Sequence, residues 1–320
     1  DYTGGGCPHI LAEPQRTNLI PYSEDFSSWT QIQNITPTPN STTSPSGEND
    51  GTKFLSTSTG TKVRENFSVV SGTTYTFSFY CKNINASNIN LVVYDGANFF
   101  SQNFTSEVNT STWSRVSLTF TALNTSVSGQ VQLAQNLPNG ESAYFWGAQL
   151  EEGSYATSYI PTSGSTVTRN QDIFTRDGIG SLINSTEGVL FVEAAALSND
   201  GTNRFLFISD GTNDNGVRFY YSTTNNQIIL RYYVGGAATA IISFTLPNAL
   251  NFNKIAFKWK VNDFALWVDG VEVGTDSSGA VLSANTLNSV SLTTGVGASP
   301  FFSKVKQLQV YKTALTDVQL

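Results

Sequence analysis

The stretch of sequence that decides the fold lies between residues 254 and 273. It reads Lys254-Ile255-Ala256-Phe257-Lys258-Trp259-Lys260-Val261-Asn262-Asp263-Phe264-Ala265-Leu266-Trp267-Val268-Asp269-Gly270-Val271-Glu272-Val273. Large apolar residues alternate with polar or small ones on both sides of Asn262-Asp263, and Asp269-Gly270 marks a second turn. Alternation with period two indicates a strand with one buried face, and such turn pairs join antiparallel strands. We therefore expect two hairpins in succession.

The same alternation recurs along most of the chain. It is clearest over residues 75–81, 116–120 and 144–150, and residues 188–193 and 305–311 are also expected to be strands. The stretch Thr223-Thr224-Asn225-Asn226 marks a further hairpin. Short strands separated by turn residues are typical of antiparallel sandwiches. The sequence predicts an all-β protein with two tandem antiparallel β-sandwich (jelly-roll) domains.

Composition divides the chain into three parts. Residues 1–20 are predicted to be an extended N-terminal segment, residues 21–164 the first sandwich and residues 165–320 the second. The boundary falls in a stretch rich in Gly, Ser and Thr. Residues 36–51, with two prolines, are expected to form a long turn region.

Charge and apolar patterning exclude two classes of partner. Only 13% of the residues are charged, the net charge is −7, and no basic stripe is present, so nucleic-acid binding has no electrostatic basis. No run of about 18 apolar residues occurs, so we expect no membrane insertion.

The rare residues carry further information. The sequence has no Met, which indicates a chain that continues N-terminal to residue 1 in its natural form. Cys7 and Cys81 are the two cysteines; a disulfide between them and two free thiols both remain open. His9 is the single histidine and lies in the N-terminal segment, so triads and lyase chemistry that need histidine are not expected in either sandwich.

Carboxylates do not form a catalytic pattern either. A retaining glycosidase needs two carboxyl groups about 5 Å apart on one face. Glu151 and Glu152 are adjacent and would face opposite ways on a strand, and Glu193 is followed by three alanines. We expect that the chain is not an enzyme.

The second half resembles the concanavalin A-like jelly roll, including laminin-G-type domains. The residues that carry this likeness are Phe257–Trp259, Leu266–Val271, Lys306–Tyr311 and Ala314–Asp317. The resemblance implies a fold more than a function. It also implies calcium at a rim loop, for which Asp210, Asn213 and Asp214 offer oxygen ligands; an ordinary polar turn explains the same residues.

Two blocks bracket the first domain: residues 13–29, with Arg16, Tyr22 and Trp29, and residues 147–169, with Tyr159 and Arg169. They resemble paired blocks in structural proteins of tailed bacteriophages, where they open and close a sandwich similar to carbohydrate-binding modules. The resemblance implies a virion surface protein of the fibre, spike or decoration type, in contact with other virion proteins and with itself as a homotrimer. Read physically, the blocks are the two ends of one sandwich, locked together.

Both resemblances suggest sugar binding, in which aromatic rings stack on sugar faces and polar groups orient the ligand. The candidate residues are Tyr94, Asp95, Asn98, Phe99 and Phe100 in the first domain and Tyr220, Tyr232 and Trp267 in the second. Core packing or subunit contact would use the same aromatics.

The resulting hypothesis is a bacteriophage virion surface protein that contributes to attachment to host glycans. Three alternatives stay open: a purely structural subunit, a polysaccharide depolymerase whose active site lies outside this segment, and a cellular adhesin.

Overall fold

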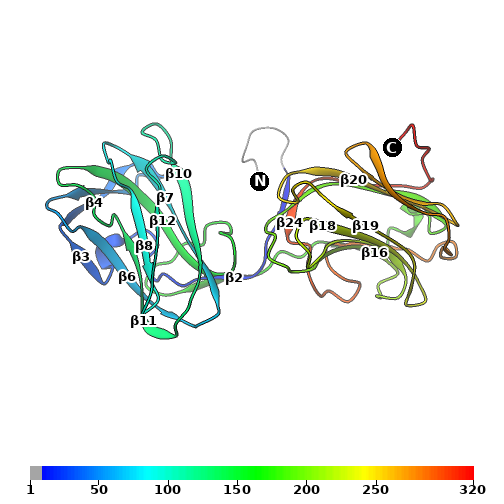
Figure 1. Cartoon of the computed structure of the whole chain (residues 1–320), viewed down its shortest axis with the longest axis horizontal. Helices are drawn as coiled ribbons and strands as arrows, with labels where there is room; N and C mark the ends of the chain where they lie inside the picture. Colours follow the sequence, from blue (N-terminus) through cyan, green and yellow to red (C-terminus); the bar gives the residue numbers. More distant parts are fainter. Residues whose placement is uncertain (1–8) are drawn as a thin grey trace. The chain divides into compact units, whose positions relative to one another are not determined.

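The structure is a computed structural model that describes residues 9–320, and it divides into two compact units. We call Gln15–Asn170 the N-terminal sandwich, and residues 9–14 together with Gln171–Leu320 the C-terminal sandwich. Both are built from antiparallel strands, which confirms the predicted all-β fold with two β-sandwiches (Figure 1). Cys7 lies outside the described residues.

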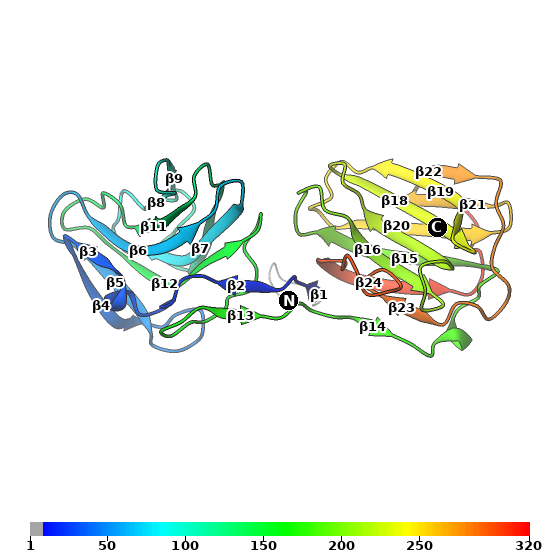
Figure 2. The same cartoon turned by 90° about the horizontal axis from the view of Figure 1, so that it is seen from below.

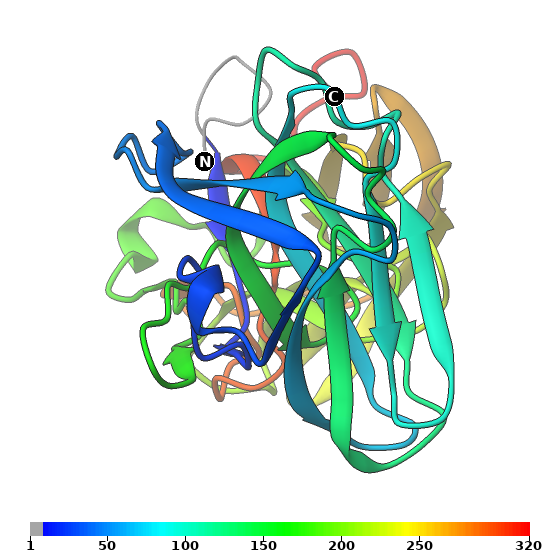
Figure 3. The ribbon, with the colours of Figure 1, turned by 90° about the vertical axis from the view of Figure 1, so that its left-hand side faces the viewer.

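Residues 15–170 form two five-stranded sheets (Figure 3). In sheet order, the first contains β10 (Ser114–Thr121), β7 (Thr74–Asn83), β12 (Ser142–Glu152), β5 (Gly51–Ser56) and β4 (Ile35–Thr42). The second contains β3 (Gln31–Gln33), β6 (Lys62–Val69), β11 (Ser126–Leu133), β8 (Asn90–Tyr94) and β9 (Phe99–Asn103). A two-stranded ribbon pairs β2 (Arg16–Asn18) with β13 (Val167–Arg169), and η1 (Phe26–Ser28) is a short 3-10 turn.

The C-terminal sandwich has two six-stranded sheets over residues 9–14 and 171–320 (Figure 2). One contains β1 (Ile10–Ala12), β24 (Ser303–Tyr311), β15 (Glu187–Ala196), β20 (Asn253–Lys260), β21 (Phe264–Val268) and β22 (Val271–Asp276). The other, which we call the β14–β19 sheet, contains β14 (Thr175–Arg176), β23 (Ser289–Ser291), β16 (Arg204–Ser209), β17 (Gly216–Tyr221), β18 (Gln227–Val234) and β19 (Ala237–Thr245). The 3-10 turn η2 spans Gly180–Leu182.

The two hairpins expected between residues 254 and 273 are present as β20–β21–β22. Their alternation works as predicted, because Phe257, Trp259 and Leu266 are fully buried in the core between the sheets while Lys254 and Lys260 face outward. Each large aromatic side chain removed from water contributes a few kcal/mol to folding.

The turn region predicted over residues 36–51 is wrong at its start, because β4 spans Ile35–Thr42 and pairs with β5. The prolines at positions 37 and 39 hid this strand. Proline cannot donate to a ladder and is tolerated on an edge strand, and β4 is the edge of its sheet.

The chain changes units at different residues from those expected. The sequence suggested one boundary near residue 165 and a separate segment over residues 1–20, whereas the chain passes from one unit to the other after residue 14 and again after residue 170. The reason is pairing: β1 joins the sheet of the C-terminal sandwich beside β24, while β2 and β13 pair with each other in the N-terminal sandwich.

No helix within residues 9–320 is long and apolar enough to cross a membrane.

Candidate functional site

The outer face of the β14–β19 sheet carries an unusual row of side chains. Strand pairing places Phe207, Arg218 and Arg231 side by side on β16, β17 and β18. The neighbouring row places Phe205 beside Tyr220. We call these five residues together with Tyr233 the arginine–aromatic face.

The core residues on the same strands show which side of the sheet faces the core and which faces outward. Leu206, Val217, Phe219 and Leu230 alternate with the face residues and are completely or almost completely buried in the core between the two sheets. Because neighbouring residues on a strand point to opposite sides, the arginine–aromatic face is the side turned away from the core. Arg218, Arg231 and Phe205 are partly exposed there. The other three residues of the face, Phe207, Tyr220 and Tyr233, are buried, with 0%, 6% and 9% of their surface exposed.

Aromatic rings hold both guanidinium groups. The Arg218 guanidinium carbon lies 4.5 Å from the ring centroids of both Phe207 and Tyr233, and that of Arg231 lies 5.6 Å from Tyr220. Cation–π contacts of this kind contribute about 0.5–2 kcal/mol each. The rings therefore hold the two cations in place without neutralising their charge.

Hydrogen bonding leaves much of both guanidinium groups available. Arg231 Nη1 donates to Tyr233 Oη at 3.1 Å, while Arg218 reaches Tyr233 Oη and the Asn213 carbonyl oxygen at 3.5 and 3.4 Å. Each guanidinium has five N–H donors. Within residues 9–320, neither arginine forms an ion pair with a carboxylate, whereas Arg204 in the same sheet donates to Asp200 at 2.6 Å.

Electrostatics reflect this arrangement. Burial lowers the pKa of Arg218, and the facing Arg231 adds to that effect. The hydrogen bond to Tyr233 raises the pKa of Arg231, and burial raises the pKa of Tyr220. An arginine starts from a pKa above 12, so both guanidinium groups stay charged at neutral pH.

Gly216 makes room for this cluster. It lies opposite Tyr233 on β18, and a Cβ atom at this position would come within 2.5 Å of the Phe207 ring and 2.2 Å of the Ile208 carbonyl oxygen. Only glycine fits so close to a backbone and a ring.

The sugar-binding residues predicted in the N-terminal sandwich divide by role. Tyr94 and Phe99 stack at 4.6 Å on the neighbouring strands β8 and β9, with Phe99 strongly exposed. Phe100 instead packs against Phe120 in the core. Asn98 donates its side-chain amide to Asp95, which closes the turn.

Asp95 is a correction to the expectation of sugar contact, because its side chain is fully buried. Burial by itself would raise its pKa, but backbone N–H groups of Asn98, Ala97 and Leu123 donate to the carboxylate and lower the pKa to about 2. Its carboxylate oxygens stabilise the turn by accepting these hydrogen bonds.

The three residues predicted in the C-terminal sandwich do not come together. Tyr220 belongs to the arginine–aromatic face. Tyr232 is fully buried beside Trp259 and donates its hydroxyl to the Ser185 carbonyl, so its predicted sugar contact is wrong. Trp267 lies on the other sheet and lines a cavity of about 280 Å³ with Phe191 and Lys254.

In the loop expected to bind calcium, side-chain oxygens of Asp210 and Asn213 already accept hydrogen bonds from the protein. Asp210 accepts from Thr212 and from the Asn215 amide, and Asn213 accepts from the Gly295 N–H. Within residues 9–320, no three His, Cys, Asp or Glu side chains gather so as to hold a metal ion. These hydrogen bonds are those of an ordinary polar turn, and the third predicted ligand, Asp214, is exposed.

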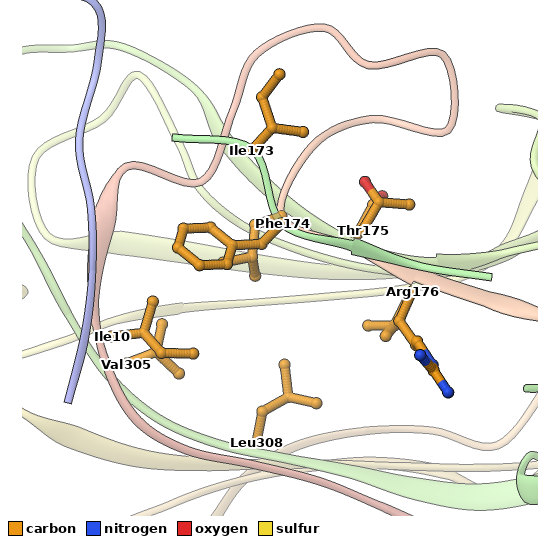
Figure 4. A pocket seen from close by; sticks show the side chains of 10 residues that line it. Ile10, Ile173, Phe174, Thr175, Arg176, Val305 and Leu308 are labelled. Atoms are coloured by element: carbon orange, nitrogen blue, oxygen red, sulfur yellow. The ribbon is translucent and has the colours of Figure 1, made fainter. Parts of the chain in front are cut away.

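A cavity of about 360 Å³ lies elsewhere in the C-terminal sandwich, at the edges of its two sheets (Figure 4). Its walls include Ile10, Phe174, Val305 and Leu308, and Arg176 is the one charged side chain among the lining residues. Polar groups that would orient a sugar are scarce there, so the arginine–aromatic face is the stronger candidate.

Of the six residues of this face, the sequence pointed only to Tyr220, and it missed Phe205, Phe207, Arg218, Arg231 and Tyr233. A signal is nevertheless present, because residues 223–226 mark a hairpin. Residues at equal distances from the centre of a hairpin face each other, which places Arg218 opposite Arg231. Two like charges opposite each other on a strand pair are unfavourable, so such a pair points to a use beyond folding.

Comparison with known proteins supports the fold of one unit. Residues 192–320 match the family model described as concanavalin A-like lectin/glucanases superfamily. The match covers most of the C-terminal sandwich and less than half of the chain. No curated protein matches the chain.

Solved structures with similar arrangements have low sequence identity. A leech intramolecular trans-sialidase shares 19% identity at a TM-score of 0.36 over 42% of this chain, and the alignment spans only 23% of that enzyme. The CBM40 of a Ruminococcus gnavus IT-sialidase shares 16% identity at 0.36, covering 46% of this chain and 96% of the module. The tandem CBM22 domains of Paenibacillus barcinonensis Xyn10C share 11% identity at 0.32, covering 95% and 100%. These likenesses carry no argument about ligands.

Proposed function

We propose that this chain is a glycan-binding protein, and that the arginine–aromatic face of the C-terminal sandwich is its binding surface. The observation that carries the proposal is the arrangement of two partly exposed arginines beside the partly exposed ring of Phe205, supported by three buried aromatic rings, on the outer side of a sheet. Aromatic rings stack against sugar C–H faces, and guanidinium donors orient sugar oxygens. The family match of this unit to concanavalin A-like lectins and glucanases agrees with such a role.

A glycan array probed with the whole chain tests the proposal. Phe205→Ala removes the half-exposed ring beside Tyr220 and should weaken binding about tenfold or more. Val261→Ala, which trims an exposed side chain after β20 in the other sheet, is the matched control and should bind like the wild type. A blank array for the wild-type chain would reject glycan binding and favour a structural subunit.

The N-terminal sandwich offers a second, smaller surface in the stacked Tyr94–Phe99 pair. We propose it as an auxiliary sugar contact. Phe99→Ala should leave binding by the C-terminal sandwich intact and lower only the sugar affinity of the N-terminal sandwich.

We further propose that the protein works at the surface of a tailed-bacteriophage virion, as a homotrimer among other virion proteins, and without catalytic activity. The support is the resemblance of residues 13–29 and 147–169 to blocks of phage structural proteins. Antibodies against the chain should label purified virions, and incubation with host polysaccharide should release no reducing ends. Absence from virions would favour a cellular adhesin.

A further inference from the structure

We propose that the arginine–aromatic face recognises acidic sugars, and that Arg218 and Arg231 bind the sugar carboxylate. This inference rests on the proposed glycan-binding function and adds the class of ligand. It depends on two observations: neither arginine has a carboxylate partner among the described residues, and both lie against aromatic rings.

The first step is the charge balance of the face. Arg218 and Arg231 are directly opposite on β17 and β18, and like charges in that relation repel each other. Among residues 9–320, no carboxylate pairs with either of them, although the chain as a whole carries a net charge of −7. An anion held between them would relieve the repulsion and satisfy donors that the protein leaves unused.

The second step is the shape of the anion. A guanidinium group presents its N–H donors as a planar fork that matches the two oxygens of a carboxylate. The rings of Phe207 and Tyr233 lie against Arg218 and limit how its fork can turn. Nε of each arginine is buried without an acceptor, so the terminal amino groups are the atoms left to meet a ligand.

The third step is the neighbouring aromatic row. Phe205 and Tyr220 are each two residues from the arginine row along their strands, a spacing of about 7 Å. Their rings lie 4.7 Å apart, and Phe205 is the partly exposed ring of the pair, because Tyr220 is only 6% exposed. One sugar ring can therefore rest on Phe205 while its carboxylate reaches Arg218. A simple anion would use only the arginines, and a neutral sugar only the Phe205 ring.

The test compares oligosaccharides of hexuronic acids with their methyl esters, which keep the shape and remove the charge. The whole wild-type chain should bind the acids at least tenfold more tightly than the esters. Arg218→Gln and Arg231→Gln should each lower affinity for the acids about 10- to 100-fold and change affinity for the esters less than twofold. Arg176→Gln, which removes one positive charge from an exposed position in the same sheet, is the control and should bind like the wild type.

Two outcomes would overturn the inference while leaving glycan binding in place. One is equal affinity for acids and esters. The other is tighter binding of sulfated than of carboxylated sugars, because the two arginines would then serve a different anion from the carboxylate. If neither acids, esters nor neutral sugars bind, the proposed function itself fails. Thermal unfolding of each variant confirms that a lost affinity does not come from a lost fold.

Discussion

The two sandwiches each place arginine among aromatic rings on the outer side of a sheet, but they use it differently. In the N-terminal sandwich, Arg115 lies over Tyr80 at 5.4 Å and donates to the Thr157 carbonyl at 2.6 Å and to Ser78 Oγ at 3.0 Å. In the C-terminal sandwich, Arg218 and Arg231 find rings but few acceptors. Arg115 therefore uses its N–H donors within the protein, whereas Arg218 and Arg231 keep most of theirs available to a ligand.

The segment that closes the N-terminal cluster is the second of the two blocks recognised in the sequence. Tyr159 packs against Trp146 at 4.5 Å and donates its hydroxyl to Ser23 Oγ and the Glu24 carboxylate. Buried Asn18, in the first block, forms hydrogen bonds to residues of the second block. The comparison teaches that a cluster of rings and arginine is not a binding site by itself; what matters is whether the fold has already supplied the acceptors.

The largest expected effect concerns Asn18, which is fully buried. Its amide donates to the carbonyls of Ala148 and Ile160 and accepts from the N–H groups of Ile20 and Leu150. Asn18→Ala leaves these two carbonyl and two N–H groups of the backbone buried without hydrogen-bond partners. The free energy of unfolding of the N-terminal sandwich should therefore fall by about 3 kcal/mol.

Urea titration can follow this unit through the thiol of Cys81, which is free and buried. Thiol labelling in a Cys7→Ser background reports unfolding of the N-terminal sandwich alone. Asn66→Ala, at an exposed position on β6, is the control and should change stability by less than about 0.5 kcal/mol. Equal stability of both variants would show that the two blocks do not depend on Asn18.

Next in size is the acid sensitivity caused by Asp95. Its pKa in the folded chain is about 2, below the usual 3.8, so the ionised form stabilises the fold above the unfolded-state pKa. This stability, about 2 kcal/mol, is lost as the pH falls from about 5 to 2. Because Asp25 also has a lowered pKa, the measurement is the difference between wild type and Asp95→Asn. That difference should disappear at pH 2, and a difference independent of pH would contradict the assignment.

A smaller effect separates the two arginine clusters directly. Arg115→Gln removes hydrogen bonds that the fold uses and should cost the N-terminal sandwich about 1–2 kcal/mol. Arg231→Gln removes a like-charge repulsion along with a cation–π contact, so the stability of the C-terminal sandwich should change by less than about 0.5 kcal/mol. Urea unfolding of both variants measures this. A large loss for Arg231→Gln would mean that the pair is structural and would weaken the binding proposal.

The smallest expected effect is that of calcium. Asp210 and Asn213 already accept hydrogen bonds within their loop. Adding a chelator, or millimolar calcium afterwards, should therefore shift the melting temperature of the C-terminal sandwich by less than about 1 °C. A clear rise with calcium would restore the rim site that the resemblance implied.

Strand alternation predicted most of the fold, because burial of one face imposes a period of two that the residues reveal directly. It failed at β4, where the prolines of an edge strand look like a turn. It also failed for Tyr232, since Tyr232 and Tyr233 are neighbours and only the register of the hairpin decides which of them enters the core. The interpretation of the two blocks as meeting chain ends is confirmed for Arg16 and Arg169, which pair across β2 and β13, for Tyr22, which bridges to Ser163, and for Tyr159, which donates to Glu24. Trp29 donates to the Tyr22 carbonyl within its own block.

By itself, the sequence determined the fold class, the two sandwiches, the hairpins and the weakness of any basic or catalytic pattern. These depend on local periodicity and composition, which each segment carries alone. Tertiary structure decided which arginines have their hydrogen-bond donors taken up by the protein itself. Arg115 meets an acceptor supplied by residues far away in sequence, whereas Arg218 and Arg231 meet each other across a hairpin. Whether a polar group is satisfied depends on everything packed around it, so it becomes visible only when the strands are assembled.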